Sequence, residues 1–330
     1  MTTACPAFAA TPALHAVQRL AALSLLVTLL TTSTVHLFGA AAPPAPVASG
    51  LASLGLYAPD SPVPLAIAHV ASIVVVGAVA SGVRNPLLHL AHVYVAWSFV
   101  VGTSLLEGGD QIGANLLMLA TPSLALDASW PRRWRASPAW RRAAADAVRP
   151  IVRLQVAIVY FHAAVDKMYT PEWRNGTAMY YWVGHEQFGA ASWLRPALDA
   201  VVTTPLGSAA LTWGVIAIEL AIAGALVAGR RYRARVLAAG LALHAGIALV
   251  HGLWTFGLVM TGALLVLCDW DGTIATQALR RARALLDRRR RARWHARARL
   301  APPRVSRQRT GLHDGTSAAA PVLFPSIHEA

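Results

Sequence analysis

Residues 236–268 read VLAAGLALHAGIALVHGLWTFGLVMTGALLVLC, a run of 33 residues without Asp, Glu, Lys or Arg. An apolar stretch of about 20 residues is long enough to cross a bilayer as a helix. Two full crossings need about 40 residues, so this run is short for two. We nevertheless expect it to hold two helices that form a hairpin turning near His251 and Gly252. The stretch therefore predicts an integral membrane protein.

The rest of the chain has the same character. Hydrophobic residues make up 56% of it and charged residues only 13%, whereas a soluble domain carries about 25% charged residues. The fold class predicted is all-α, a polytopic transmembrane helix bundle of about eight spans with short helices in the outer loops. The spans are expected at 20–40, 62–82, 86–106, 111–126, 148–169, 208–229 and, as a pair, within 234–267.

The loops between these spans alternate in charge. Loops 41–61 and 107–110 contain no Lys or Arg, whereas loop 127–147 contains five arginines and loop 230–233 reads Arg-Arg-Tyr-Arg. Basic loops remain on the cytoplasmic side of a membrane. The alternation predicts a multi-pass protein of the cell membrane with both its N- and C-termini in the cytoplasm.

The net charge of +14 also comes largely from arginines that lie beside apolar segments. Ten arginines lie between Arg280 and Arg299, beside the last apolar segment, where they would bind anionic lipid headgroups. No recognition module for nucleic acid accompanies them, so we expect no nucleic-acid binding. The domains expected are an N-terminal tail (1–15), a transmembrane domain (16–270), a basic amphipathic cytoplasmic helix (271–300) and a disordered tail (301–330).

The predicted fifth span carries ionisable residues, which are costly inside a membrane and usually face a bundle interior or cavity. Arg153 recurs with Tyr160 and Lys167 every seven residues, so the three form one stripe. His162 and Asp166 are four residues apart and lie close along a helix. The alternative is that Arg153 extends to the inner surface while Asp166 and Lys167 lie at the outer interface. The candidate catalytic residues are Tyr160, His162, Asp166 and Lys167.

The outer loop after this span is rich in aromatic residues. Aromatic residues are enriched at membrane interfaces in general, and this enrichment accounts for the presence of each of them taken alone. Together with a glycine and a threonine directly after the charged helix end, they predict a structured outer pocket. The candidate substrate-binding residues here are Trp173, Gly176, Thr177, Tyr180, Tyr181 and Trp182.

Other polar residues lie at membrane depth or close to it. Glu219 is in the middle of a span and needs a partner, for which Lys167 and His244 are the candidates. Asp110 begins a helix, as a simple cap or as part of a site. Glu219, His244 and Asp110 join the candidate substrate-binding set. His89 and His92 have a spacing that suits a metal but no third ligand, so no metal site is predicted.

The residues from 153 to 194 resemble one bacterial family. The motifs are Arg-Leu-Gln at 153–155, Tyr-Phe-His-Ala-Ala at 160–164, Lys-Met at 167–168, Glu-Trp at 172–173 and Asn-Gly-Thr-Ala-Met-Tyr-Tyr-Trp at 175–182. The Gly-Gly-Asp-Gln turn at 108–111 also fits. They resemble the sporulation-delaying protein B family, over about residues 15–270. That family is similar to a wider one, the horizontally transferred transmembrane domain, which includes the membrane part of vitamin K-dependent gamma-carboxylase.

The resemblance implies a role in the maturation or export of a small secreted peptide toxin. It also implies two partners, the toxin precursor and an adjacently encoded protein. By the wider likeness Lys167 matches the carboxylase lysine proposed as the base that deprotonates the vitamin. Asp166 stands where the carboxylase has another lysine, and no large β-rich domain follows the membrane part, so carboxylase activity does not carry over. Whether the chain binds a cofactor stays open.

The residues leave three functions open. The chain is a maturation factor for an exported peptide, a quinone-dependent carboxylase-like or oxidoreductase enzyme with Lys167 as base, or a transporter in which Glu219 and His244 relay protons. Whether it is an enzyme stays open with them.

Overall fold

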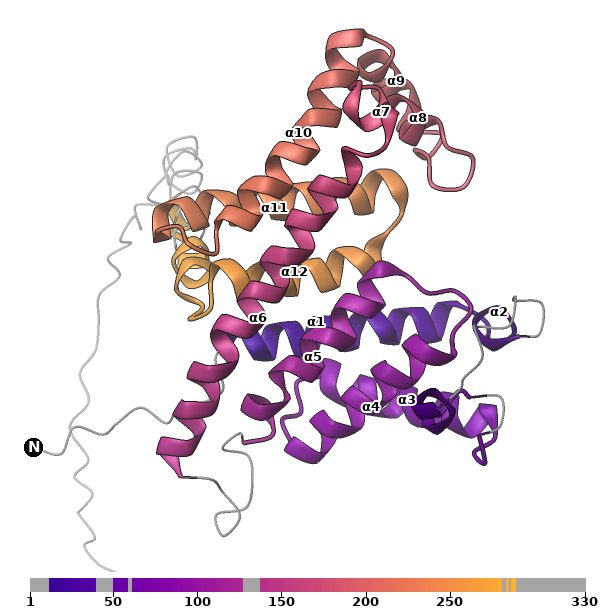
Figure 1. Ribbon diagram of the computed structural model, residues 1–330, viewed down its shortest axis with the longest axis vertical. Helices are drawn as coiled ribbons and strands as arrows, with labels where there is room; N and C mark the ends of the chain where they lie inside the picture. Colours follow the sequence, from indigo (N-terminus) through magenta and orange to yellow (C-terminus); the bar gives the residue numbers. More distant parts are fainter. Residues whose placement is uncertain are drawn as a thin grey trace, which may run out of the picture. The chain divides into compact units, whose positions relative to one another are not determined.

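The computed structural model describes residues 12–39, 50–58, 61–126, 137–280, 283–284 and 286–288 (Figure 1). Every regular element among these residues is helical, in agreement with the predicted all-α class. The elements are α1 (Pro12–Thr31), α2 (Thr34–Phe38), η1 (Gly50–Leu54), α3 (Leu65–Ala80), α4 (Pro86–Gly102), α5 (Gly108–Leu124), α6 (Pro138–Lys167), α7 (Pro171–Arg174), α8 (Ala178–Gly184), α9 (Arg195–Val202), α10 (Pro205–Gly224), α11 (Arg230–His251) and α12 (Trp254–Cys268).

The expected hairpin in the last apolar run is present. α11 ends at His251 and α12 begins at Trp254. Gly252 between them has φ of 72°, a left-handed conformation that glycine adopts without a steric penalty. The turn therefore forms where the sequence placed it, whereas α11 begins at Arg230, before the uncharged run, and α12 has only 15 residues.

The predicted number of crossings is not supported. Among the described residues, four helices are long and apolar enough to span a membrane, namely α1, α6 from Ala139, α10 and α11. A fifth is added if α12 and the helical segment Thr273–Arg280, which meet at 106°, count as one span. The helices α3 and α4 are apolar but shorter. A helix of 17 residues, such as α4, extends about 25 Å, less than the roughly 30 Å hydrocarbon core.

The first helix differs from its predicted bounds. It begins at Pro12, not near residue 20, and ends at Thr31. Gln18 explains the early start, because its side-chain amide is 3.2 Å from Nδ1 of His89 on α4. Arg19 donates to the backbone oxygen of Ala80 at 3.3 Å. Polar residues that appeared to delay the helix are paired with neighbouring helices instead.

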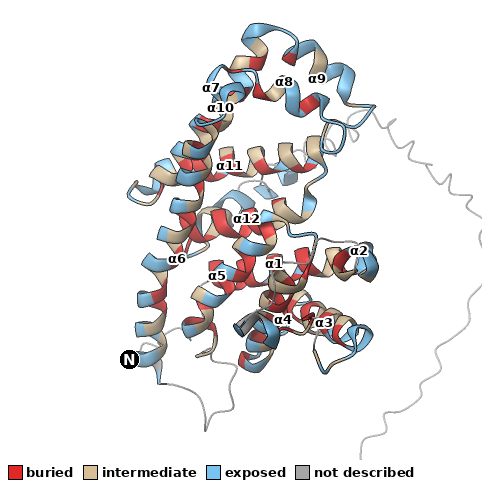
Figure 2. Ribbon diagram, turned by 45° about the vertical axis from the view of Figure 1, so that its right-hand side comes forward, coloured by how far each residue is buried: buried red, intermediate tan, exposed pale blue. Residues whose placement is uncertain are grey.

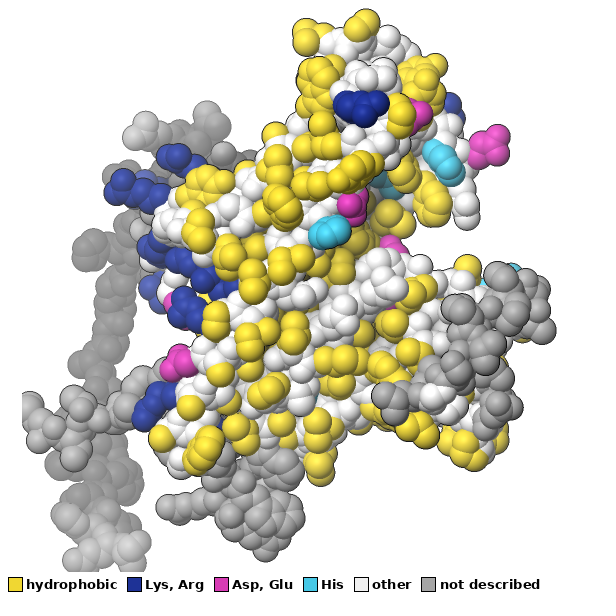
Figure 3. Space-filling model, in the orientation of Figure 1, with side chains coloured by type: hydrophobic (Ala, Val, Ile, Leu, Met, Phe, Trp, Pro, Cys, Tyr) yellow, Lys and Arg dark blue, Asp and Glu magenta, His cyan; other side chains and the backbone are white. Residues whose placement is uncertain are grey.

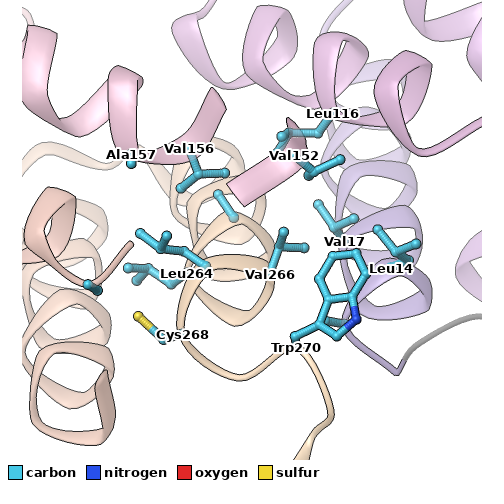
Figure 4. Close-up of a cluster of buried hydrophobic side chains, with 14 of the residues drawn as sticks. Leu14, Val17, Leu116, Val152, Val156, Ala157, Leu264, Val266, Cys268 and Trp270 are labelled. Carbon is cyan, nitrogen blue, oxygen red and sulfur yellow. The ribbon is translucent and has the colours of Figure 1, made fainter. Parts of the chain in front are cut away.

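The core forms around α1 and α12, which pack against each other. Buried residues concentrate where these helices meet α5 and α6 (Figure 2). In the close-up, Leu14 and Val17 of α1 face Val266 of α12, with Val152 and Val156 of α6 beside them (Figure 4). A second cluster joins α1 to α3, α4 and α5.

The helix that carries the candidate catalytic residues is the longest described. α6 has 30 residues and continues through Pro150. It lies beside α10, and the short helices α7, α8 and α9 form the connection between the two (Figure 1). The predicted short loop helices are therefore present. Most of the basic tail, from residue 289 onward, lies outside the described residues.

Candidate functional site

The seven-residue stripe on α6 forms the side of the helix that faces its neighbours. At the end of the stripe nearer the N-terminus, the guanidinium of Arg153 donates to the backbone oxygen of Leu267 at 3.1 Å and to that of Leu226 at 3.1 Å. These carbonyls belong to the last turn of α12 and to the residues that follow α10, where helix carbonyls lack partners within the helix. Arg153 therefore joins the ends of α10 and α12 to the middle of α6, which is a structural role.

Tyr160, the middle residue of the stripe, is buried against α11. Its hydroxyl is 2.7 Å from Nε2 of His244, and the His244 ring is T-shaped to Phe256 with 5.5 Å between centroids. Nδ1 of His244 is buried with no hydrogen-bond partner among the described residues. A buried phenol and imidazole in direct contact form a polar pair inside an apolar bundle.

Lys167, the last residue of α6, forms an ion pair with Glu219 of α10. Its Nζ is 2.8 Å from Oε1 and 2.9 Å from Oε2, and it also donates to the backbone oxygen of Ala163 at 3.1 Å. The side chains are 22% and 10% exposed. Lys167 is thus one of the two partners predicted for Glu219. All three donors of the ammonium are used, so in this arrangement the amine is not available as a base unless Glu219 takes its proton.

An aromatic pocket adjoins this pair. The ammonium of Lys167 lies 5.3 Å from the centroid of the Trp173 ring, within the range of a cation–π contact. Trp173 also lines a pocket of about 260 Å³. The pocket is lined by Thr170, Glu172, Trp173, Ala178, Tyr181, Trp182 and His185. Three of these aromatic residues were predicted from the sequence, whereas Thr170, Glu172, Ala178 and His185 were not.

His162 and Asp166 do not join this site. They contact each other, with 3.1 Å between Nδ1 and Oδ2, but their side chains are 71% and 64% exposed. Neighbouring residues on a helix differ by about 100° in direction, so positions 162 and 166 lie away from the buried stripe. Their assignment to one catalytic group with Lys167 is therefore not supported by the geometry. In the sequence, the seven-residue spacing of Arg153, Tyr160 and Lys167 already distinguishes this stripe from His162 and Asp166.

The remaining loop candidates shape the connection between α6 and α10. Gly176 has φ of 80°, and its backbone oxygen accepts from the Ser208 hydroxyl at 3.1 Å. Thr177 donates to the backbone oxygen of Glu172 at 3.4 Å. Tyr180 is exposed and meets Tyr181 edge to face, at 5.3 Å between centroids. Gly176 thus ties the loop to α10, Thr177 and Tyr180 contact other residues of the loop, and none of the three lines the pocket.

Asp110 belongs to a different part of the molecule. It lies in the first turn of α5, before the predicted fourth span, and its Oδ2 accepts from the backbone N–H of Glu107 at 3.3 Å. It lines a small cavity whose other lining residues come from α1, α4, α5 and α12. Burial, and then the negative charge of Glu107, raise the pKa of Asp110 to about 7. Asp110 is thus both a cap and a cavity residue, but not part of the Lys167 site.

The histidine pair of α4 has two different environments. His89 contacts the Gln18 amide at 3.2 Å and the Thr121 hydroxyl at 3.1 Å, while His92 has no partner among the described residues. In the part of the chain that the structure describes, no three His, Cys, Asp or Glu residues are grouped to bind a metal ion.

The fold and this site indicate a helical membrane protein with a part-buried ion pair beside an aromatic pocket. The chain is 28% identical over 212 residues to the uncharacterized protein YitO of Bacillus subtilis, covering 61% of this chain and 66% of that protein. It is 26% identical over 189 residues to the sporulation-delaying protein SdpB of Bacillus subtilis, covering 56% and 58%. The matches span less than two thirds of either relative. No family model and no solved structure matches.

The similarity to SdpB supports the first of the two resemblances seen in the sequence, as a distant relationship. The wider likeness to the horizontally transferred transmembrane domain and to the carboxylase gains no support from these matches and stays a prediction.

Proposed function

We propose that this chain is a multi-pass membrane protein of the sporulation-delaying protein B type, which acts in the maturation or export of a small secreted peptide toxin. The distant similarity to SdpB supports the connection with a toxin. We assign the site from the Lys167–Glu219 ion pair. The Lys167 ammonium of this pair contacts Trp173, which lines the aromatic pocket.

The geometry suits a peptide more than a small polar solute. The pocket combines flat aromatic surfaces with the Glu172 carboxylate and the His185 imidazole. Aromatic surfaces bind apolar and amphipathic side chains, and a few polar groups fix their orientation. The adjoining ion pair supplies a half-buried ammonium and a buried carboxylate, which are positioned to bind the peptide backbone or to move a proton.

The proposal includes an orientation of the protein in the membrane. The pocket faces the outside of the cell, and both termini lie in the cytoplasm. Arg230, Arg231, Arg233 and Arg235 begin α11, at the end opposite to the one that leads into α12. In the space-filling view most of the coloured Lys and Arg side chains lie toward the left edge, and apolar side chains cover much of the rest of this face (Figure 3). Basic residues mark the cytoplasmic side.

An enzymatic version of the proposal remains the second candidate. In it Lys167 removes a hydroxyl proton from a hydroquinone, the reduced form of the quinone, after Glu219 has accepted the lysine proton. The contact between the two groups favours this order of events, since the ammonium is already hydrogen-bonded to both carboxylate oxygens. A transporter is the third candidate and has the weakest support, because His244 contacts Tyr160 and not Glu219.

The decisive experiment is mass spectrometry of the secreted peptide from cells that carry the unaltered protein, Lys167→Ala or Lys167→Arg. We expect Lys167→Ala to abolish the mature peptide because Glu219 then lacks a buried partner. If Lys167→Arg restores the peptide, the amine acts through its charge, and if it does not, the base role is favoured. Mature peptide at normal mass and amount from Lys167→Ala would refute the assignment of the site.

The control for this experiment is His162→Ala. His162 is on the same helix, five residues earlier, but is exposed and lies away from the pair. We expect this variant to release the same peptide as the unaltered protein, which separates loss of the site from general damage to α6.

A further inference from the structure

A small cavity lies among α1, α4, α5 and α12, apart from the Lys167 site. Its volume is about 10 Å³, the space that a single water molecule needs. Most of its lining consists of small or apolar residues, with three polar exceptions: Ser24 of α1, His92 of α4 and Asp110 of α5. An apolar cavity of this size stays empty, but a polar one binds water.

His92 is the feature that a dry cavity leaves unexplained. It is fully buried, and neither Nδ1 nor Nε2 has a hydrogen-bond partner among the described residues. His89, one turn earlier on α4, is hydrogen-bonded through both ring nitrogens. A buried polar group without a partner costs free energy that a bound water removes.

Asp110 presents a carboxyl group to the same space. The acid next to it, Glu107, is already engaged by α12, because Oε2 of Glu107 accepts from the Thr255 hydroxyl at 2.7 Å. On the side of α1, the Ser24 hydroxyl donates to the backbone oxygen of Thr255 at 3.1 Å, which leaves its oxygen free to accept. Among the residues that line the cavity, the other titratable group is His92 of α4, and Glu107, the residue before α5, binds Asp110 through its backbone N–H.

We propose that this cavity binds one water molecule, which links His92 to Asp110 so that the two side chains share a single proton. In one arrangement the carboxyl holds the proton and the imidazole is neutral. In the other, the proton has passed through the water, and a carboxylate faces an imidazolium. Both arrangements have no net charge, which is the condition for burying the pair at low cost. The site is independent of the proposed function.

The test is a double-mutant cycle in the full-length protein, purified in detergent, with the melting temperature at pH 7 as the readout. We expect His92→Leu and Asp110→Asn each to lower the melting temperature by roughly 2–4 °C or more. Because both remove the same water link, the double variant is expected to melt close to the less stable single variant. Additive losses would contradict the link, and so would a higher melting temperature for His92→Leu, which is the result for a dry cavity.

The matched control is His89→Leu combined with Asp110→Asn. His89 is on the same helix but has its own partners, so its effect is expected to add to that of Asp110→Asn. Should the His92 variant fail to fold, an experimental density map of the unaltered protein decides the matter. Density for a water within hydrogen-bond distance of both His92 and Asp110 is expected, and an empty cavity in a map that shows other internal waters would overturn the proposal.

Discussion

At the scale of single residues, position along α6 separates structural groups from exposed ones. Arg153, Tyr160 and Lys167 each bind a different neighbour: the ends of α10 and α12, His244 of α11, and Glu219 of α10. His162 and Asp166 pair with each other in an exposed position. The two faces of α6 therefore differ in role: residues of the stripe bind neighbouring helices, whereas His162 and Asp166 bind each other at the surface.

The two ion pairs of α6 provide a direct comparison. Removing one partner of a buried pair leaves an uncompensated charge and costs about 3–5 kcal/mol, whereas an exposed pair contributes about 0–1 kcal/mol. We expect Glu219→Ala to lower the melting temperature of the purified protein strongly. Asp166→Ala, which breaks the exposed pair, is the matched control and should leave it nearly unchanged. Equal shifts would mean that the Lys167–Glu219 contact is not buried in the native protein.

The phenol of Tyr160 is a second residue-scale test. Tyr160→Phe keeps the ring but leaves Nε2 of His244 without its partner at 2.7 Å. The loss of a buried hydrogen bond with one partner left behind costs about 1–3 kcal/mol. Tyr94→Phe is the control, because the Tyr94 hydroxyl donates to the backbone oxygen of Leu54 from an exposed position. Thermal unfolding should show a clear loss for the first variant and little change for the second.

The charge of Asp110 gives the stability a pH dependence. The pKa of Asp110 is raised from 3.8 to about 7 in the folded protein, so between these values the folded chain binds more protons than the unfolded chain. Stability is then highest near pH 4 and falls as the pH rises to about 7. Asp110→Asn should remove this part of the slope in melting temperature, whereas Asp199→Asn, an exposed acid beside Arg195, should not. Parallel profiles for the unaltered protein and Asp110→Asn would disprove the assignment.

At the scale of helices, close approach between α1 and α12 organises the core. Gly262 of α12 faces Val17 of α1 so closely that an added Cβ would be 2.9 Å from the Val17 Cα. Small residues at such contacts allow backbones to pack tightly inside membranes. The contact explains why a helix that begins with polar residues still lies at the centre of the bundle.

Glycine substitutions test this packing. Gly262→Ala forces α1 and α12 apart and is expected to destabilise the protein by about 1–3 kcal/mol. Gly246→Ala, within α11 and with open space around it, removes backbone freedom from the unfolded chain and should stabilise by about 0.5–1 kcal/mol. Opposite shifts in the denaturation midpoint are expected, and a tolerated Gly262→Ala would show that the two helices lie further apart.

At the scale of the whole molecule, orientation decides whether the pocket serves the outside of the cell. Trp140 begins α6 near the arginine-rich loop, and Tyr181 lines the pocket at the other end of the helix. Both side chains are exposed. The proposed arrangement places them on opposite sides of the membrane.

Labelling of single cysteines in intact cells tests this arrangement. In a variant without Cys5 and Cys268, Tyr181→Cys is expected to react with a maleimide that cannot cross the membrane. Trp140→Cys should react only after the cells are opened. The reverse pattern would place the Lys167 site in the cytoplasm, and the proposed role in peptide maturation outside the cell would fail with it.

The sequence alone determined the helical class, the approximate positions of most of the helices that the structure describes, and the turn at Gly252, but not how many of these helices are long enough to cross a membrane. These follow from the free energy of burying apolar side chains and from local backbone geometry, both of which act over neighbouring residues. The stripe of Arg153, Tyr160 and Lys167 was also visible, because the period of a helix is fixed.

Only the tertiary structure decided which polar residues meet. Lys167 and Glu219 are 52 residues apart, and Tyr160 and His244 are 84 apart, so their pairing depends on how α6, α10 and α11 pack. The exposure of His162 and Asp166, the early start of α1 and the cavity beside His92 depend on the same packing. The cost of burying a charge requires that each such group find a partner, but the spacing of residues along the chain does not say which one.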